Sequence, residues 1–302
     1  MPQKPLHLPA PAQRWIETLA TDLFAVPGMA VDFAVPPGEP ALVPAGFVSW
    51  RVFANPVTLF IGGVAAVLLE LGEPRVRHGV WDHSGFRVDP VMRLRRTGLA
   101  AMVTVYGAES TARAMIAGVN RLHARVSGVT AGGTPYRADD PELLDWVQAT
   151  ASWGFLEAYA AYGRPLTLAE RDAYYAEAAP AAALYGAAGA PRSAAGIGRL
   201  FARTAPALEP SATISEFLGI MRRAPILPAA ARPLQGLLVA AAISLLPGQL
   251  AARLGLSGGG LKPWQRQAVR AIARVAGRIP LAGSPPVEAS RRLGVSADPL
   301  YR

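Results

Sequence analysis

The residue best placed to do chemistry in this sequence is a histidine on the apolar side of a predicted helix. The chain has four histidines and no cysteine, and His123 is the histidine that falls in line with apolar residues at helical spacing. The residues in this line are Ala112, Ile116, Val119, His123 and Val126, so its steps are 4, 3, 4 and 3 residues long. An imidazole that points inward has to satisfy two ring nitrogens. The commoner arrangement is a core histidine bonded to a backbone carbonyl, and the functional alternative is an axial ligand of haem iron.

A second group with chemical potential lies on the helix predicted to follow Asp89-Pro90. Arg93, Arg96 and Thr97 stand at positions i, i+3 and i+4, so two guanidinium groups and a hydroxyl share one face. One interpretation is a solvated basic edge on which Thr97 bonds back to its own helix. The other is a set of donors directed at haem propionates or at iron-bound oxygen, because charge-assisted hydrogen bonds are strong.

The other three histidines are less informative. His83 lies between Asp82 and Ser84 in a stretch that we expect to be a loop. It is predicted either to pin that loop or to stand on the distal side of a haem pocket. A hydrolytic triad is disfavoured, because sequence neighbours do not face one another in a triad and no G-x-S-x-G motif occurs. His78 is expected to be a solvated surface residue, and His7 is expected to lie in an N-terminal arm.

The composition excludes several classes of protein. The absence of cysteine excludes disulfides, iron–sulfur clusters and thiolate-ligated haem. The net charge is +9, but no basic stripe alternates with aromatic residues, so we do not expect a nucleic-acid partner. The N-terminus lacks the apolar region of a secretory signal, which predicts a cytoplasmic location. The most apolar stretch, Leu234 to Leu246, is too short to span a bilayer, so no transmembrane segment is expected and a peripheral membrane contact stays open.

Start and stop signals predict a fold that is all-α. An Asn or Asp followed by Pro marks three helix starts, at Asn55-Pro56, Asp89-Pro90 and Asp140-Pro141, and Thr167 to Glu170 reads as a capping box. The expected helices cover about 56–71, 90–106, 110–127 (ended by Gly128), 141–163, a fifth from Thr167, and then 193–204, 214–223, 233–246 and 263–278. No alternating pattern of the kind found in strands persists.

The domain organisation follows from where these signals lie. Residues 1–50 are rich in Pro and Gly, and we expect an irregular arm that packs on the domain and contains a short helix at about 12–24. Residues 51–280 are expected to form a single helical domain, and residues 281–302 a C-terminal tail at the surface.

Five blocks of sequence lie in order between residues 55 and 177. They begin with NPVTLFIGGVAAVLLELGEPRVRHGVWDHSGFRVDPVMRLRRT and VYG, and continue with VNRLHARVSG, YRADDPELLDWVQAT and LEAYAAYGRPLTLAERDAYYAE. Together they resemble the signature of the oxygenase family that includes fungal MpaB and bacterial latex-clearing protein, a rubber oxygenase.

This resemblance implies a globin-like helical bundle that holds haem b and an oxygenase that uses dioxygen on an olefinic, isoprenoid-like hydrophobic substrate. His123 corresponds to the proximal ligand of the iron, and Arg93 and Thr97 correspond to residues beside the haem. Arg96 occupies the position from which a lysine can reach the iron in rubber oxygenases, but arginine does not readily lose its proton to become a ligand. In the hypothesis that follows, Arg93 and Arg96 pair with propionates or tune the distal side, Thr97 bonds the bound oxygen, and His83 moves protons.

The sequence departs from the family pattern at one further position. The family usually reads Trp-Val-His where this chain reads Trp146-Val147-Gln148. With Arg96, this residue suggests a second hypothesis, a haem-binding or sensing module without turnover. A third hypothesis, a cofactor-free helical lipid-binding protein, rests on the apolar stretch at 234–246 and the positive charge.

Overall fold

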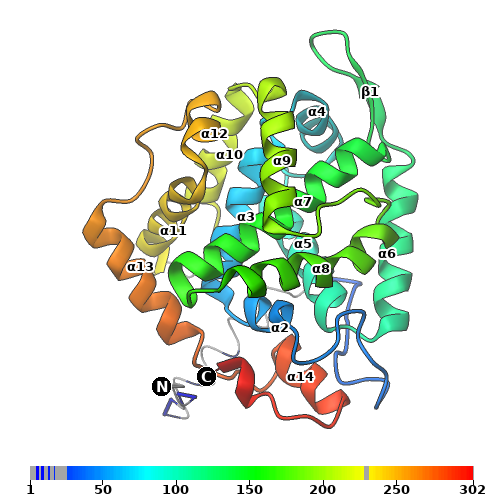
Figure 1. Cartoon of the computed structure of the whole chain (residues 1–302), viewed down its shortest axis with the longest axis vertical. Coiled ribbons are helices and arrows are strands. Elements are labelled where there is room, and N and C mark those ends of the chain that lie inside the picture. The colour runs from blue at the N-terminus through cyan, green and yellow to red at the C-terminus, as the bar shows by residue number, and fades with distance from the viewer. Residues whose placement is uncertain are drawn as a thin grey trace.

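The computed structural model describes residues 26–227 and 231–301, together with Pro5, Leu6, Leu8, Pro9, Gln13 and Glu17. Within these residues the fold is all-α, as the sequence predicts, with thirteen α-helices and one two-stranded hairpin (Figure 1). His7 and most of the helix expected at 12–24 lie outside the described residues. The globin-like arrangement that the resemblance implies stays a prediction.

The helices of the first half of the chain are α2 (Val48–Phe53), α3 (Pro56–Glu70), α4 (Pro74–His83), α5 (Pro90–Tyr106), α6 (Glu109–His123) and α7 (Pro141–Ala158), which continues into a π-helical turn, η1 (Tyr159–Gly163). The second half contains α8 (Leu168–Leu184), α9 (Ala194–Thr204), α10 (Ala212–Arg223), α11 (Arg232–Leu245), α12 (Gly248–Arg253), α13 (Pro263–Ala276) and α14 (Pro285–Arg292), with 3₁₀ turns at Ala205–Ala207 and Asp298–Tyr301. The hairpin strands are β1 (Ser127–Val129) and β2 (Pro135–Arg137), which pair antiparallel.

The helix starts predicted from the sequence are confirmed by their caps. The side chain of Asn55 accepts hydrogen bonds from the backbone N–H groups of Val57 and Thr58 at the start of α3. Asp89 and Asp140 cap α5 and α7 in the same manner, each followed by a proline. At the start of α8, Thr167 and Glu170 form both bonds of the capping box. These side chains satisfy donors that the first turn of a helix leaves free.

The centre of the bundle is the contact between α3 and α7, which lie in the middle of Figure 1. A Cβ atom placed on Gly62 would lie 2.6 Å from the backbone oxygen of Gly154, and a Cβ on Gly154 would meet the oxygen of Gly62. The two helices therefore approach closely because neither residue has a side chain.

The segment between α3 and α5 differs from the expectation. Residues 74–83 were expected to be a connection and a loop around His78 and His83, but they form helix α4, which starts at Pro74 and is capped by the side chain of Glu73. The signal was the same as elsewhere, a capping residue followed by proline, with glutamate in place of Asn or Asp.

The third predicted helix also ends earlier than expected. Helix α6 stops at His123, and residues 127–129 form strand β1 in place of a last helical turn. Gly128 is therefore not a helix terminator. It lies opposite Tyr136 in the hairpin, where a Cβ atom would come within 2.6 Å of the Tyr136 hydroxyl oxygen. The missing side chain makes room for this ring.

The C-terminal residues do not form the surface tail that was expected. They contain α14, in which Arg292 is buried and donates hydrogen bonds to the backbone oxygens of Glu39, Phe33 and Tyr106. Three carbonyl groups from the arm and from α5 therefore converge on one guanidinium. The arm itself has no regular structure over 26–47, and its residues Val26, Phe33, Ala41 and Val43 are buried.

The apolar stretch near the C-terminus forms α11, whose residues Leu238, Val239, Ala241, Ala242 and Ile243 are buried in the core. Within the described part of the chain, none of the helices has by itself the length and apolar composition of a membrane span. Helices α3 and α4 together have that length and composition, but they are bent by 114° relative to each other.

Candidate functional site

The candidate site is centred on the C-terminal end of α6, where His123 lies. Its ring points to the same side of α6 as the buried residues Ala112 and Ile116, as the sequence predicts. The Nδ1 atom is buried and has no hydrogen-bond partner among the described residues, while the residue as a whole keeps some accessible surface. The hydrogen bond to a backbone carbonyl that an ordinary core histidine would make from this nitrogen is therefore not found in the described part of the chain.

The surroundings of His123 favour its neutral form. Burial lowers the pKa of the imidazole, the positive charge of Arg93 lowers it further, and Asp139 opposes both effects. Asp139 is itself paired with Arg137, whose Nη2 lies 2.9 Å from its Oδ2. A neutral imidazole with a free nitrogen is the form in which histidine binds a metal ion.

Helix α5 places Arg93 next to this ring. Nη1 of Arg93 donates to the hydroxyl oxygen of Thr97 at 2.8 Å, and that hydroxyl donates to the backbone oxygen of Arg93 at 2.9 Å. Thr97 therefore bonds back to its own helix and at the same time fixes the arginine. Burial lowers the pKa of Arg93, the charge of Glu70 opposes this, and the charge of Arg96 adds to it. The site thus contains a partly buried cation, which favours a negatively charged partner.

Glu70, which sequence reasoning did not single out, is an acidic residue of the site. It is the last residue of α3, and burial raises the pKa of its carboxyl group from 4.5 to about 7, against the effects of Arg93 and Thr150. The hydroxyl of Thr150 lies 3.4 Å from Oε1 of Glu70, but it also lies 3.0 and 2.9 Å from the backbone oxygens of Trp146 and Val147. Its single proton is therefore shared, and Glu70 is weakly stabilised as an anion. The signal available in the sequence was that Glu70 is the only charged residue of α3.

The remaining predicted residues take different places. Arg96 is exposed on α5, close enough to Arg93 to affect its pKa, and Thr97 is exposed as well. His83 ends α4 and its Nε2 lies 3.0 Å from the hydroxyl oxygen of Tyr136 in the hairpin. The structure therefore brings His123, Arg93, Thr97 and Glu70 together through α3, α5 and α6, and it holds His83 against β2.

The donor set limits the kind of metal group that would fit. Across the described ranges, no three side chains of His, Asp, Glu or Cys come together as ligands of an ion. A metal at His123 would therefore need most of its ligands from outside the chain, as the porphyrin of a haem supplies them. The free nitrogen of His123 and the partly buried guanidinium of Arg93 fit the iron and the propionates of such a group.

The fold and the site define an all-helical protein that carries a histidine, an arginine and a glutamate on three helices inside one bundle. The family described as "ER-bound oxygenase mpaB/B'/Rubber oxygenase, catalytic domain" matches residues 50–279. The chain belongs to this family of oxygenase catalytic domains, which places it among the oxidoreductases. All residues of the candidate site lie inside the matched range.

Two curated relatives are similar to part of the chain. They are uncharacterised proteins of Mycobacterium bovis and Mycobacterium tuberculosis, each 34% identical over 119 residues, which is 38% of this chain and 46% of the relative. The chain thus aligns with about half the length of these relatives. No solved structure matches the chain.

Proposed function

We propose that the protein is a haem-b-dependent oxygenase that uses dioxygen to cleave or oxidise an olefinic, isoprenoid-like hydrophobic substrate. The observation that carries the proposal is the buried Nδ1 of His123, which has no hydrogen-bond partner among the described residues. Membership of an oxygenase family supports the reaction class. The haem and the substrate are the proposed parts.

His123 would be the protein ligand of the iron. His123 is the last residue of α6, so the helix holds its backbone in place. After the helix, the backbone N–H of Ala138 bonds the oxygen of Val126, which ties the hairpin to the end of α6. Haem b, when bound, supplies an iron at which dioxygen is activated. Burial and the charge of Arg93 both lower the pKa of His123, which favours the neutral form that would bind this iron.

The two arginines of α5 would bind the propionates. Arg93 is held by Thr97, so its guanidinium is oriented before a ligand arrives, and Arg96 adds a second positive charge one turn further along the helix. The hydroxyl proton of Thr97 is used by a backbone oxygen, so a bond from Thr97 to bound oxygen would require this hydroxyl to rotate. In this proposal Thr97 acts first as the residue that positions Arg93.

Glu70 would hold or release a proton close to Arg93. A carboxyl group with a pKa of about 7 is populated in both forms near neutral pH, which is the property that proton transfer requires. The proton-transfer role predicted for His83 would require its contact with Tyr136 to open, because its Nε2 is engaged there.

Products formed under oxygen test the proposal. Reduced, haem-loaded protein incubated with squalene and dioxygen is expected to give fragments with carbonyl groups, and His123→Ala should not. His78→Ala is the matched control, because His78 bonds Asp82 on α4 and lies outside the candidate site. Stable binding of oxygen or carbon monoxide without product would overturn the oxygenase assignment in favour of the haem-binding module that Gln148 suggests. The cytoplasmic location and a peripheral membrane contact stay predictions.

A further inference from the structure

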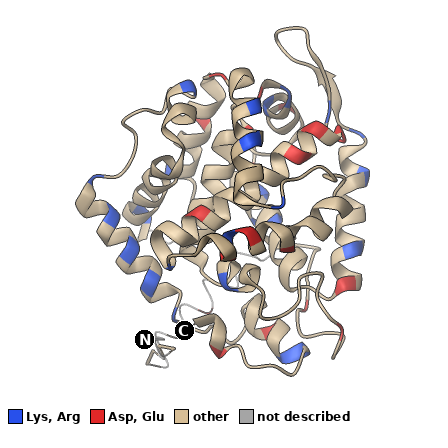
Figure 2. Cartoon of the chain, viewed as in Figure 1, with Lys and Arg blue, Asp and Glu red and all other residues tan. Residues whose placement is uncertain are grey.

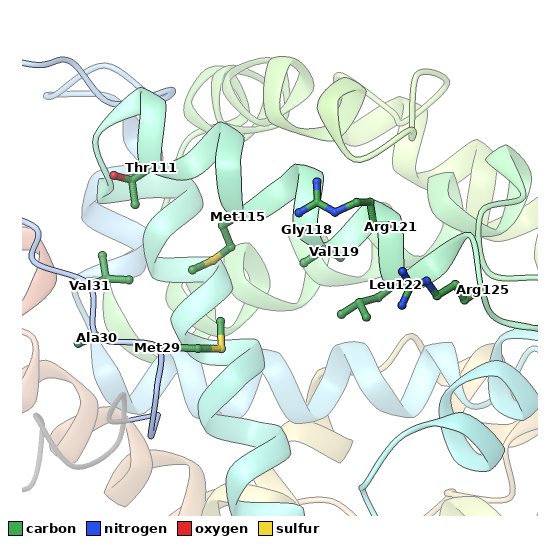
Figure 3. Close-up of a pocket in the computed structure, with 10 residues that line it drawn as sticks. All are labelled: Met29, Ala30, Val31, Thr111, Met115, Gly118, Val119, Arg121, Leu122 and Arg125. Atoms are coloured by element: carbon green, nitrogen blue, oxygen red, sulfur yellow. The ribbon is translucent and has the colours of Figure 1, made fainter.

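A groove of about 540 Å³ lies between the outer side of α6 and the N-terminal arm (Figure 3). Met29 and Val31 of the arm and Met115, Val119 and Leu122 of α6 form its apolar wall. Leu122 and Met29 are 61% and 41% exposed, so these apolar side chains are accessible from solvent. A groove of this size is in the range of sites that take small ligands, about 300 to 1,000 Å³.

The groove lies beside the stripe of α6 that carries His123, and Val119 of that stripe also lines the groove. Thr111, Met115, Gly118 and Leu122 follow one another at steps of 4, 3 and 4 residues, so they form one stripe along α6. Ala112, Ile116 and His123 form the inward stripe, which is turned by about 100° around the helix axis. His123 does not line the groove. The groove and the candidate site therefore lie on adjacent sides of α6 and meet at Val119.

Two arginines, Arg121 and Arg125, bring positive charge to the groove. Arg121 lies in the last turn of α6 and Arg125 in the turn that follows the helix. In Figure 3 the guanidinium of Arg125 lies beside Leu122, away from Met29 and Val31. The Nη2 atom of Arg121 lies 3.7 Å from where a Cβ of Gly118 would be, so this side chain folds back along the helix.

Neither arginine forms an ion pair within the ranges that the structure describes, whereas Arg113 of α6 pairs with Glu109 at 2.7 Å. Figure 2 shows an acidic residue at the start of α6 and basic residues further along it. The charge of the groove is therefore left for a ligand.

We infer that this groove binds a long-chain carboxylate as a single molecule. An apolar wall that ends at a guanidinium matches a linear apolar chain with one anionic head, and the planar fork of arginine matches a carboxylate in bidentate geometry. Met29 and Met115 suit a flexible chain, because methionine side chains adapt to irregular apolar surfaces. The chain of the ligand lies between the two methionines, and the head lies at Arg125.

Binding of dodecanoate measured by calorimetry, below the concentration at which it forms micelles, tests this inference. We expect saturable binding of one molecule per chain. Arg125→Gln should weaken it about tenfold or more, because a hydrogen-bonded charged head loses its partner. Arg113→Gln is the matched control, since it removes the same charge from a nearby position on α6 outside the groove, and it should leave the affinity unchanged. Met115→Gln should also weaken binding, because it places a polar group in the apolar part.

Three results would overturn the inference. The first is equal binding of dodecanol, which lacks the charge. The second is an equal loss in Arg113→Gln and Arg125→Gln, which would indicate a general charge effect. The third is association only with anionic phospholipid vesicles, which would indicate a membrane surface. Circular dichroism of the variants shows that each has folded. The experiment requires no haem, so its outcome is independent of the function proposed for His123.

Discussion

The buried carboxyl group of Glu70 gives a pH dependence of stability that can be worked out from the structure. Burial raises its pKa from 4.5 to about 7, so between these values the folded protein holds a proton that the unfolded chain releases. The contribution of Glu70 to the free energy of unfolding is therefore present in full below pH 4.5. It falls as the pH rises to about 7 and does not change further above that pH. The difference between the two pKa values corresponds to about 3 kcal/mol, of which about 2 to 3 kcal/mol falls between about pH 5 and pH 8.

Glu70→Gln removes this titration and keeps the shape of the side chain. The measurement is the free energy of unfolding in urea at several pH values between 5 and 8, for the wild type and the variant in the same cofactor state. The advantage of the wild type over the variant should shrink by about 2 to 3 kcal/mol across this range. Glu142→Gln serves as the control, because Glu142 is exposed in a surface ion pair with Arg75. A constant difference between wild type and Glu70→Gln over the whole range would refute the reasoning.

Two further predictions concern the packing of the bundle and the anchoring of the arm. Gly62→Ala should lower the free energy of unfolding by about 1 to 3 kcal/mol, since its Cβ would lie 2.6 Å from the Gly154 oxygen. Gly63→Ala should have little effect, because its Cβ would meet only a side chain at 3.8 Å, and equal losses in urea unfolding would contradict the close-approach account. Arg292→Gln should cost about 3 kcal/mol in the same assay, because three backbone oxygens lose a charged donor, while the exposed Arg291→Gln should be nearly neutral. A neutral Arg292→Gln would show that the arm is held by its apolar residues alone.

The main helices could be predicted because the residues that start them are adjacent in the sequence. The Asn or Asp that precedes Pro at three helix starts is a local signal, and it needs no tertiary contact to act. Helix α4 was missed because its cap is a glutamate, Glu73, which is a less usual capping residue. The end of α6 was missed because Gly128 serves the hairpin, and this role depends on Tyr136 across the strand. Helix α14 starts at Ser284-Pro285, a local signal like the others, but its burial depends on contacts with distant segments, such as those of Arg292.

In the candidate site, too, some features follow from local sequence and others from tertiary packing. The inward direction of His123 follows from the spacing of apolar residues on one helix, and the shared face of Arg93 and Thr97 follows from their spacing on another. Their meeting with Glu70 depends on how α3, α5 and α6 pack, which is not encoded in any one segment. The sequence offered one hint, a single charged residue in an otherwise apolar helix.

The absorption spectrum of the purified protein tests the central claim most directly. If His123 is the ligand of a haem iron, the wild type shows a Soret band, His123→Ala loses it, and His78→Ala keeps it. A His123→Ala protein that folds and retains the haem content of the wild type would contradict the assignment.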